Sequence, residues 1–143
     1  MDAIVMLRDD HKKVERLFKA FEKGDLGVVP EICEALTVHA AVEESIFYPA
    51  VRAEGGDASE DIGEAVEEHH LVKILIEEIG QLSPDEEAYT SKATVLMELV
   101  RHHVKEEEDE MFPVVRSELG RSRLLELGDE MERLQSTLVR RAA

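Results

Sequence analysis

Basic residues, cysteine and tryptophan are scarce in this sequence. It contains 17 lysines and arginines against 33 aspartates and glutamates, one cysteine and no tryptophan, and its formal net charge is −16. Because nucleic acids and anionic membranes bind basic surfaces, this charge argues against both as partners. The single thiol, Cys33, cannot form an internal disulfide, which favours a reducing compartment.

Long apolar segments are also missing. No run approaches the roughly 18 apolar residues of a membrane-spanning helix, and the first residues lack the basic and then apolar layout of a signal peptide. We therefore expect a cytoplasmic protein that is not bound to a membrane. The 143 residues suffice to bury a core, and we predict a single domain over residues 1–143.

Strand patterns are absent as well, because apolar residues recur at helical spacing along the whole chain. Asp57 and Glu60 form a capping-box pattern, and Ser83 followed by Pro84 indicates another helix start. The short loops predict an all-α, up-down-up-down four-helix bundle over about residues 2–117, with a shorter fifth C-terminal helix. The five helices are expected at residues 2–22, 30–54, 61–80, 83–117 and about 121–140.

Two segments, residues 39–49 and 103–113, repeat one pattern. In each, a histidine is followed four residues later by a glutamate, then by a second glutamate, an aromatic residue and a proline in the same register. On a helix, residues i and i+4 lie on one face, so each segment directs an imidazole and a carboxylate to one point. Two such helices facing each other would form a metal site. Its predicted ligands are His39, Glu43, His103 and Glu107.

Two further histidines lie on apolar helical faces. His11 shares its face with Leu7 and Val14, and His69 shares its face with Val72. A lone inward histidine is usually a hydrogen-bonded core residue. Four of them, one on each long helix, together with two inward glutamates, would leave buried polar groups unpaired at about 1–3 kcal/mol each unless a metal binds them.

Four imidazoles and two carboxylates form a ligand set that discriminates among metals. Structural zinc takes four ligands and often thiolates, whereas calcium and magnesium prefer oxygen ligands. The set suits two borderline ions, with iron ahead of manganese or zinc, bridged by Glu43 and Glu107. A ferritin-like site would need Glu-x-x-His on two helices. Only Glu67 and His70 fit that motif, so we disfavour it.

With these ligands in this order, residues 3–115 resemble the hemerythrin-like, or HHE cation-binding, domain family, in its single-domain bacterial type. The family pattern is a lone His, a His-x3-Glu, a lone His and a second His-x3-Glu on four successive helices. The resemblance implies a non-haem di-iron centre, with two Fe ions joined by an oxo or hydroxo bridge. Its ligands would be His11, His39, Glu43, His69, His103 and Glu107.

Two choices within this ligand set have alternatives. His69 is preferred to His70 because Glu68 and the residues after His69 are similar to the third-helix run of the family. His103 is preferred to His102 because only His103 keeps the register of the first repeat. His70 and His102 would then support ligands or lie on the surface. Glu44 and Glu108, which follow the two bridging glutamates, are candidates to orient ligands.

The sequence departs from the pattern of oxygen-carrying hemerythrins. In the pattern typical of oxygen carriers, a fifth histidine follows the third-helix histidine by four residues, and an aspartate follows the last histidine by five residues. Lys73 and Glu108 stand here instead. The site is thus one imidazole short, which leaves a position for peroxide, water or a phenolate. Tyr48 is a candidate for it, although ideal helix angles turn Tyr48 away from Glu43 and favour a packed aromatic, unless Pro49 rotates that turn.

Two classes of function follow. The first is an enzyme that decomposes hydrogen peroxide or related oxidants in a catalase-like reaction at the di-iron centre. The second is a reversible carrier or sensor of O2 or NO, or an iron-responsive protein without turnover. Only the segment at about residues 121–140 offers such a sensor an output. That segment is less acidic than the rest, which would suit docking in a homodimer.

Overall fold

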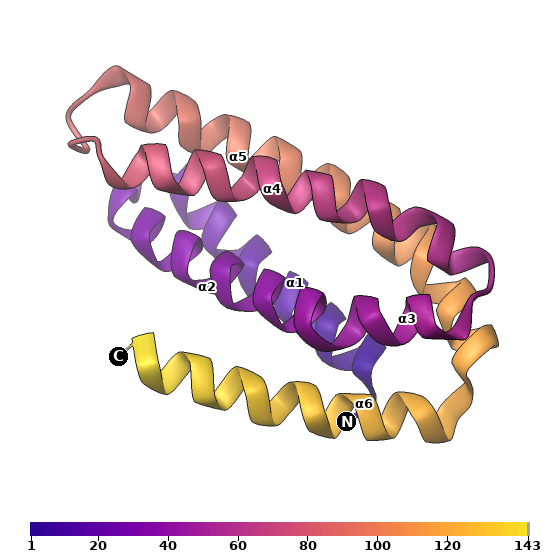
Figure 1. Cartoon of the computed structure of the whole chain (residues 1–143). Helices are drawn as coiled ribbons and strands as arrows, with labels where there is room; N and C mark the ends of the chain where they lie inside the picture. The colour runs from indigo at the N-terminus through magenta and orange to yellow at the C-terminus, as the bar shows by residue number, and fades with distance from the viewer. Residues whose placement is uncertain (143) are drawn as a thin grey trace.

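The computed structural model describes residues 1–142, and every regular element in this range is helical. The all-helical bundle predicted from the sequence is confirmed (Figure 1). The α-helices are Ala3–Glu22 (α1), Val29–Val42 (α2), Tyr48–Glu54 (α3), Ile62–Gly80 (α4), Glu87–Glu106 (α5) and Phe112–Ala142 (α6). Four short elements join them: Leu26–Val28 (η1), Glu43–Phe47 (η2), Asp57–Asp61 (η3) and Glu107–Met111 (η4).

Two of the short elements, η2 and η4, are π-helical turns within longer helices. η2 joins α2 to α3, and η4 joins α5 to α6, so that four long helices form the bundle. Gly120, at φ 80° and ψ 169°, breaks α6 into two arms. The C-terminal arm of α6, residues 121–142, is the fifth helix of the prediction, and it packs along α1 and α2 (Figure 1).

One predicted cap and one predicted helix start were wrong, although α4 begins at Ile62, within a residue of the prediction. Asp57 does not cap α4. Residues 57–61 form a 3-10 turn, and Glu118 from α6 accepts the hydrogen bond of the Ala58 backbone N–H at 3.0 Å. α5 begins at Glu87 rather than near Ser83, because the Glu86 carboxylate accepts from the Ser83 N–H at 2.7 Å and closes a turn before the helix. Both differences come from contacts used to turn the chain between helices.

The buried apolar side chains form two clusters, with the predicted metal ligands between them. On α1, His11 lies between Leu7 of one cluster and Val14 of the other. The same order holds on the other three long helices, where each inward histidine separates residues of the two clusters. The polar residues therefore occupy the middle of the bundle, where packing on both sides holds them rigidly.

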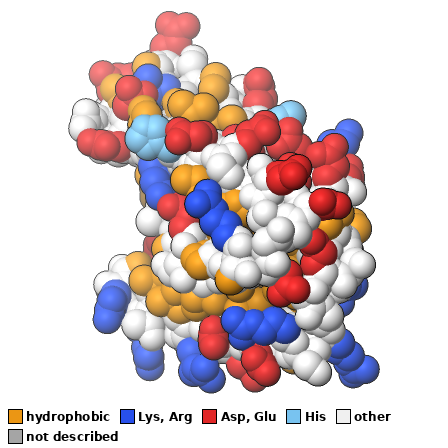
Figure 2. All heavy atoms as spheres, turned by 45° about the vertical axis from the view of Figure 1, so that its right-hand side comes forward, with side chains coloured by type: hydrophobic (Ala, Val, Ile, Leu, Met, Phe, Trp, Pro, Cys, Tyr) orange, Lys and Arg blue, Asp and Glu red, His pale blue; other side chains and the backbone are white. Residues whose placement is uncertain are grey.

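The surface carries both signs of charge, unevenly spread. In the face drawn in Figure 2, acidic side chains cover much of the upper part, and basic side chains gather in the lower part, where α6 lies. Within residues 1–142, no helix combines the length and the apolarity needed to cross a membrane.

Candidate metal centre

The structure brings the six predicted ligands into one buried cluster. The most exposed of them is His39, at 8%, and Glu43 is completely buried. They come from α1, α2, η2, α4, α5 and η4, so every long helix contributes. The six residues are His11, His39, Glu43, His69, His103 and Glu107.

The four histidines form two pairs, and Glu43 lies between them. His11 and His39 place their Nε2 atoms 3.3 Å apart, while the rings of His69 and His103 are centred 4.8 Å apart. The Oε1 atom of Glu43 lies 3.2 Å from His39 Nε2 and 3.1 Å from His69 Nε2. Glu43 thus reaches one histidine of each pair, as a bridging ligand must.

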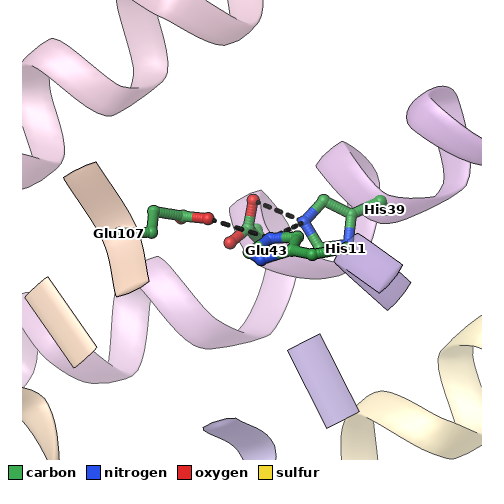
Figure 3. Close-up of side chains that lie close together, drawn as sticks. All are labelled: His11, His39, Glu43 and Glu107. Carbon is green, nitrogen blue, oxygen red and sulfur yellow. Dashed lines mark hydrogen bonds and ion pairs between the residues drawn. The ribbon is translucent and has the colours of Figure 1, made fainter. Parts of the chain in front are cut away.

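Glu107 occupies the equivalent position on the other side of the cluster. Its Oε1 atom lies 3.3 Å from His11 Nε2, and its Oε2 atom lies 3.4 Å from His103 Nε2. Figure 3 shows the first group of donors, in which His11, His39, Glu43 and Glu107 converge. The donor atoms of this group all lie within 4.8 Å of one another.

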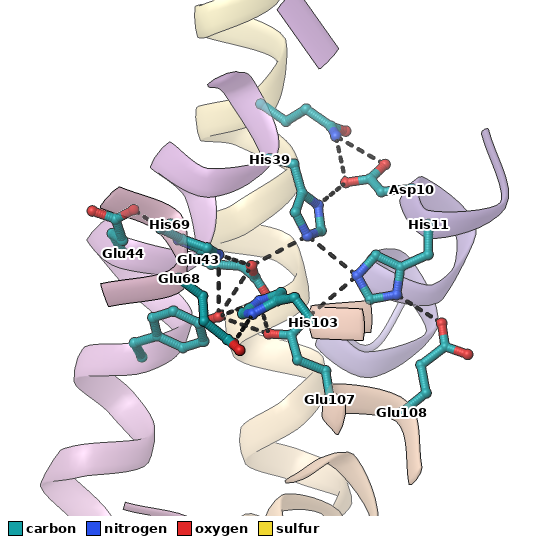
Figure 4. Close-up of polar contacts among 12 residues, drawn as sticks. Asp10, His11, His39, Glu43, Glu44, Glu68, His69, His103, Glu107 and Glu108 are labelled. Atoms are coloured by element: carbon teal, nitrogen blue, oxygen red, sulfur yellow. Dashed lines mark hydrogen bonds and ion pairs between the residues drawn. The ribbon is translucent and has the colours of Figure 1, made fainter. Parts of the chain in front are cut away.

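Each of the four histidines donates its other ring nitrogen, Nδ1, to a carboxylate on a neighbouring helix (Figure 4). With one proton held on Nδ1, Nε2 is the nitrogen that faces the centre and can bind a cation once it carries no proton of its own. Glu44 and Glu108 were predicted as candidates to orient ligands, whereas the sequence analysis assigned no such role to Asp10 and Glu68. All four carboxylates directly precede or follow a predicted ligand in the sequence, and this adjacency could have identified them. The contacts are His11–Glu108 at 2.7 Å, His39–Asp10 at 3.3 Å, His69–Glu44 at 2.7 Å and His103–Glu68 at 2.6 Å.

Charge within the cluster shifts the proton affinities of its members. Burial lowers the pKa of His39, but the Glu43 and Asp10 carboxylates outweigh it and hold that pKa well above its ordinary value. Burial also opposes protonation of His103, yet the hydrogen bond and charge of Glu107 raise its pKa to about 10. Burial raises the pKa of Glu43, but His39 outweighs it and keeps the pKa well below its ordinary value. A cation that binds here therefore displaces protons.

Two buried oxygens test whether a metal fits. Within residues 1–142, Glu43 Oε2 and Glu107 Oε1 have no hydrogen-bond partner. Each such atom costs about 1–3 kcal/mol unless something compensates for it. The surrounding donors are imidazole nitrogens and carboxylates, the set that borderline metal cations prefer. The residues present fit metal cations.

Tyr48 points into the cluster, contrary to the expectation from ideal helix angles. Its hydroxyl donates to Glu107 Oε2 at 2.7 Å and lies 3.2 Å from Glu43 Oε1. The same oxygen is 3.4 Å from His69 Nε2 and 3.3 Å from His103 Nε2. The cause is the π-turn η2, in which the Tyr48 N–H bonds to the Glu43 carbonyl five residues back. In a π-turn, residues i and i+5 come closer to one face than in an α-helix.

The phenol makes the two halves of the cluster different. Burial, together with the charges of Glu43 and Glu107, raises the pKa of Tyr48 far above its ordinary value, so its proton stays on the oxygen. In the second repeat, Phe112 takes the place of Tyr48 and stacks on His11, with ring centroids 5.9 Å apart. Among residues 1–142, a hydroxyl therefore lies beside the half that contains His69 and His103.

A family model described as the hemerythrin HHE cation binding domain matches residues 2–115. The chain belongs to the hemerythrin HHE family. This HHE chain is similar to a curated protein of Nostoc sp. named DNA nickase, with 30% identity over 141 residues. The match covers 95% of this chain but only 40% of that longer protein. A crystal structure of an HHE cation binding domain-containing protein from Mycobacterium kansasii shares the fold, with a TM-score of 0.82 at 21% identity, covering 96% of this chain and 87% of that one.

The remaining histidines of this HHE chain lie outside the cluster. His70 is exposed, and His102 points outward and pairs with Glu106 at 2.7 Å. Glu67 is exposed like His70, so the Glu-x-x-His motif of a ferritin-like site does not face the core. Lys73, at the position of the fifth histidine of oxygen carriers, pairs instead with Glu44 at 2.8 Å.

A small cavity adjoins the cluster on the side away from Tyr48. It encloses about 30 Å³ and is lined by the four inward histidines, four valines, one leucine and one alanine. A volume of about 10–15 Å³ suffices for one water molecule. The cavity therefore has room for a molecule of a few atoms, but not for an organic substrate.

Proposed function

We propose that this chain is a non-haem di-iron protein that decomposes hydrogen peroxide or related oxidants in a catalase-like reaction. One observation carries the proposal: two histidine pairs share Glu43 and Glu107 beside a cavity of about 30 Å³. His11 and His39 would hold one iron, His69 and His103 would hold the other, and the two glutamates would bridge them.

Bound iron would supply the electrons that one peroxide molecule takes up and a second returns. The balanced reaction converts two hydrogen peroxide molecules to two water molecules and one oxygen molecule. The protein residues have simpler tasks. Asp10, Glu44, Glu68 and Glu108 keep the Nδ1 protons in place, and the small apolar cavity admits peroxide while excluding larger reductants.

Tyr48 is the residue of this chain best placed to handle a proton in the reaction. Tyr48 is 2% exposed, and its hydroxyl lies within 3.4 Å of His69, His103 and both bridging carboxylates. A hydroxyl in this position can donate to or accept from a small molecule in the same half of the site. The missing fifth imidazole is compatible with this assignment, since it would leave one metal with fewer protein ligands, and the Tyr48 hydroxyl already contacts both bridging carboxylates.

A second candidate function is reversible binding of O2 or NO, as a carrier or a sensor. The composition of the cavity favours it: apart from the four histidines, every lining residue is aliphatic. The aliphatic part of this wall suits an apolar diatomic molecule, and only the four histidines offer hydrogen bonds to peroxide. Evolution of oxygen from peroxide separates the two candidates, because a carrier changes its spectrum without releasing gas.

The partners that we propose are small molecules, in a cytoplasmic protein that does not bind DNA or membranes. The formal net charge of −16 opposes contact with phosphates. DNA cleavage is the named activity of a relative more than twice as long, and it forms no part of this proposal. The basic side chains near α6 (Figure 2) would support pairing with an acidic surface of a second copy.

The test is metal content, visible spectrum and oxygen release, measured on protein purified from iron-supplemented cells. We expect about two irons per chain, a spectral change on adding peroxide, and gas evolution that Glu43→Ala abolishes. Glu78→Ala is the matched control, because Glu78 is an exposed glutamate that pairs with Lys92 away from the cluster. A two-iron protein that releases no oxygen, with Glu43→Ala behaving identically, would eliminate the peroxide reaction.

A further inference from the structure

The C-terminal arm of α6 reaches the metal centre although it lies beyond residues 2–115, the range that the family model matches. Its Gln135 side chain donates from Nε2 to both carboxylate oxygens of Asp10, at 3.1 Å and 3.0 Å. Asp10 Oδ2 in turn accepts from His39 Nδ1 at 3.3 Å (Figure 4). A chain of contacts thus runs from the arm to one of the predicted ligands.

We propose that Gln135 is a positioning residue of the metal centre, which orients Asp10 so that the proton of His39 stays on Nδ1 and Nε2 is left for a cation. The C-terminal arm is then part of the metal site. The inference rests on the metal-binding part of the proposed function and is independent of the peroxide reaction.

Asp10 depends on a protein donor more than Glu44 and Glu108 do. Its side chain is 9% exposed, whereas those of Glu44 and Glu108 are 26% and 33% exposed and can be hydrated. Glu44 also has the ammonium group of Lys73 at 2.8 Å. No lysine or arginine within residues 1–142 forms an ion pair with Asp10. A buried carboxylate needs donors, and the Gln135 amide supplies one to each oxygen.

The arm is docked closely enough to hold an amide in place. Leu124, Leu127 and Met131 are at most 1% exposed and lie on the face that also carries Gln135. At Gly128 the arm approaches the start of α1 so closely that a Cβ atom would lie 1.9 Å from the Met1 carbonyl oxygen. The position of Gln135 is therefore set by packing one and two turns away.

Water would compete for Asp10 if the amide were removed. A groove of about 370 Å³ runs between α1, α2 and the arm, and Asp10, His39 and Gln135 all line it. A water molecule in the place of the amide can both donate and accept, so it would not hold the carboxylate in one orientation. The result expected is a looser His39 and weaker metal binding at the His11 and His39 half of the centre.

The test is titration of the metal-free full-length protein with Co²⁺, followed by its visible absorption. Removing a residue that hydrogen-bonds a ligand typically weakens metal binding about 10- to 100-fold. We expect this loss for one of two Co²⁺ ions in Asp10→Asn, and about a tenfold loss for the same ion in Gln135→Leu. Ser136→Ala, an exposed neighbour on the same arm, should bind both ions as the native protein does.

A double variant separates positioning from general stability. If Gln135 acts through Asp10, Gln135→Leu causes no further loss in the Asp10→Asn background. Gln135→Glu, which keeps the shape but replaces the donor by an acceptor, should weaken Co²⁺ binding at least as much as Gln135→Leu. It provides the measurement if Gln135→Leu does not fold.

Three results would overturn the inference. Equal Co²⁺ affinity in the native protein and in Gln135→Leu removes it and leaves the proposed function standing. A loss of the same factor in the Asp10→Asn background shows that Gln135 acts through stability alone. A native protein that binds no Co²⁺ overturns both the inference and the proposed function.

Discussion

Replacing Tyr48 by phenylalanine tests the most specific geometric feature of the cluster. The change removes one oxygen from a side chain that is 2% exposed, and it leaves the ring packed. Glu107 Oε2 then loses the donor at 2.7 Å, its shortest hydrogen bond. A hydrogen bond to a charged group contributes about 1.5–3 kcal/mol, so we expect the free energy of unfolding of the metal-free variant, measured by urea titration, to fall by that amount.

The chain contains a matched control, because it has only two tyrosines. Tyr89 is 5% exposed and lies in the apolar cluster away from the metal centre. Tyr89→Phe should change the free energy of unfolding by less than about 0.5 kcal/mol, as is usual away from polar networks. If Tyr48→Phe and Tyr89→Phe were equally stable, the Tyr48 hydroxyl would not support Glu107 and the geometric reasoning would be refuted.

The same pair of variants examines the iron-loaded protein. A tyrosine phenolate bound to ferric iron gives a visible charge-transfer absorption. If Tyr48 occupies the position left by the missing imidazole, Tyr48→Phe loses this absorption and Tyr89→Phe keeps it. An unchanged spectrum in Tyr48→Phe would restrict Tyr48 to the hydrogen bonds described above.

Three further predictions concern the rest of the chain. Gly128→Ala should destabilise the protein by about 1–3 kcal/mol in thermal unfolding, because the new methyl group meets the Met1 backbone; Gly63→Ala, where the structure leaves open space, should not destabilise it. Burial raises the pKa of the Cys33 thiol, so its alkylation should be slower than that of a free peptide thiol at neutral pH and should accelerate on unfolding; equal rates in the folded and unfolded chains would contradict this. The pKa of His103 is about 10 in the folded protein and about 6.5 when unfolded. Protonated His103 therefore stabilises the folded metal-free protein. This stabilisation is complete below pH 6.5 and is lost as the pH rises toward 10. The urea midpoint of the metal-free protein should therefore fall between pH 7 and pH 10, and a midpoint that rose would show that His103 is not held protonated.

Local pattern alone predicted the helices and the inward residues. Each histidine of the cluster sits on an apolar helical face, and the His-x3-Glu spacing brings His39 to Glu43 and His103 to Glu107, because both relations lie within a single helix. The choice of His69 over His70, and of His103 over His102, agrees with their burial, since one residue of displacement turns a side chain from the core toward solvent.

Contacts between helices were beyond the reach of periodicity. The partner of the Ala58 N–H depends on which side chain reaches it from another helix, as Glu118 does. The inward turn of Tyr48 required a π-turn, which the sequence marked only by the position of Pro49. A local pattern cannot predict whether the turn before a proline is α-helical or π-helical, because packing against the neighbouring helices determines the hydrogen-bond register.

The sequence by itself determined that four helices would each bring a histidine to a common core, since the 3.6-residue period and the buried position of those residues are properties of single segments. Only the tertiary structure decided how that core is supported. The link from Gln135 through Asp10 to His39 joins residues separated by up to 125 positions, and no local rule relates them. They meet because the C-terminal arm packs on α1, which depends on the shapes of both helices at once.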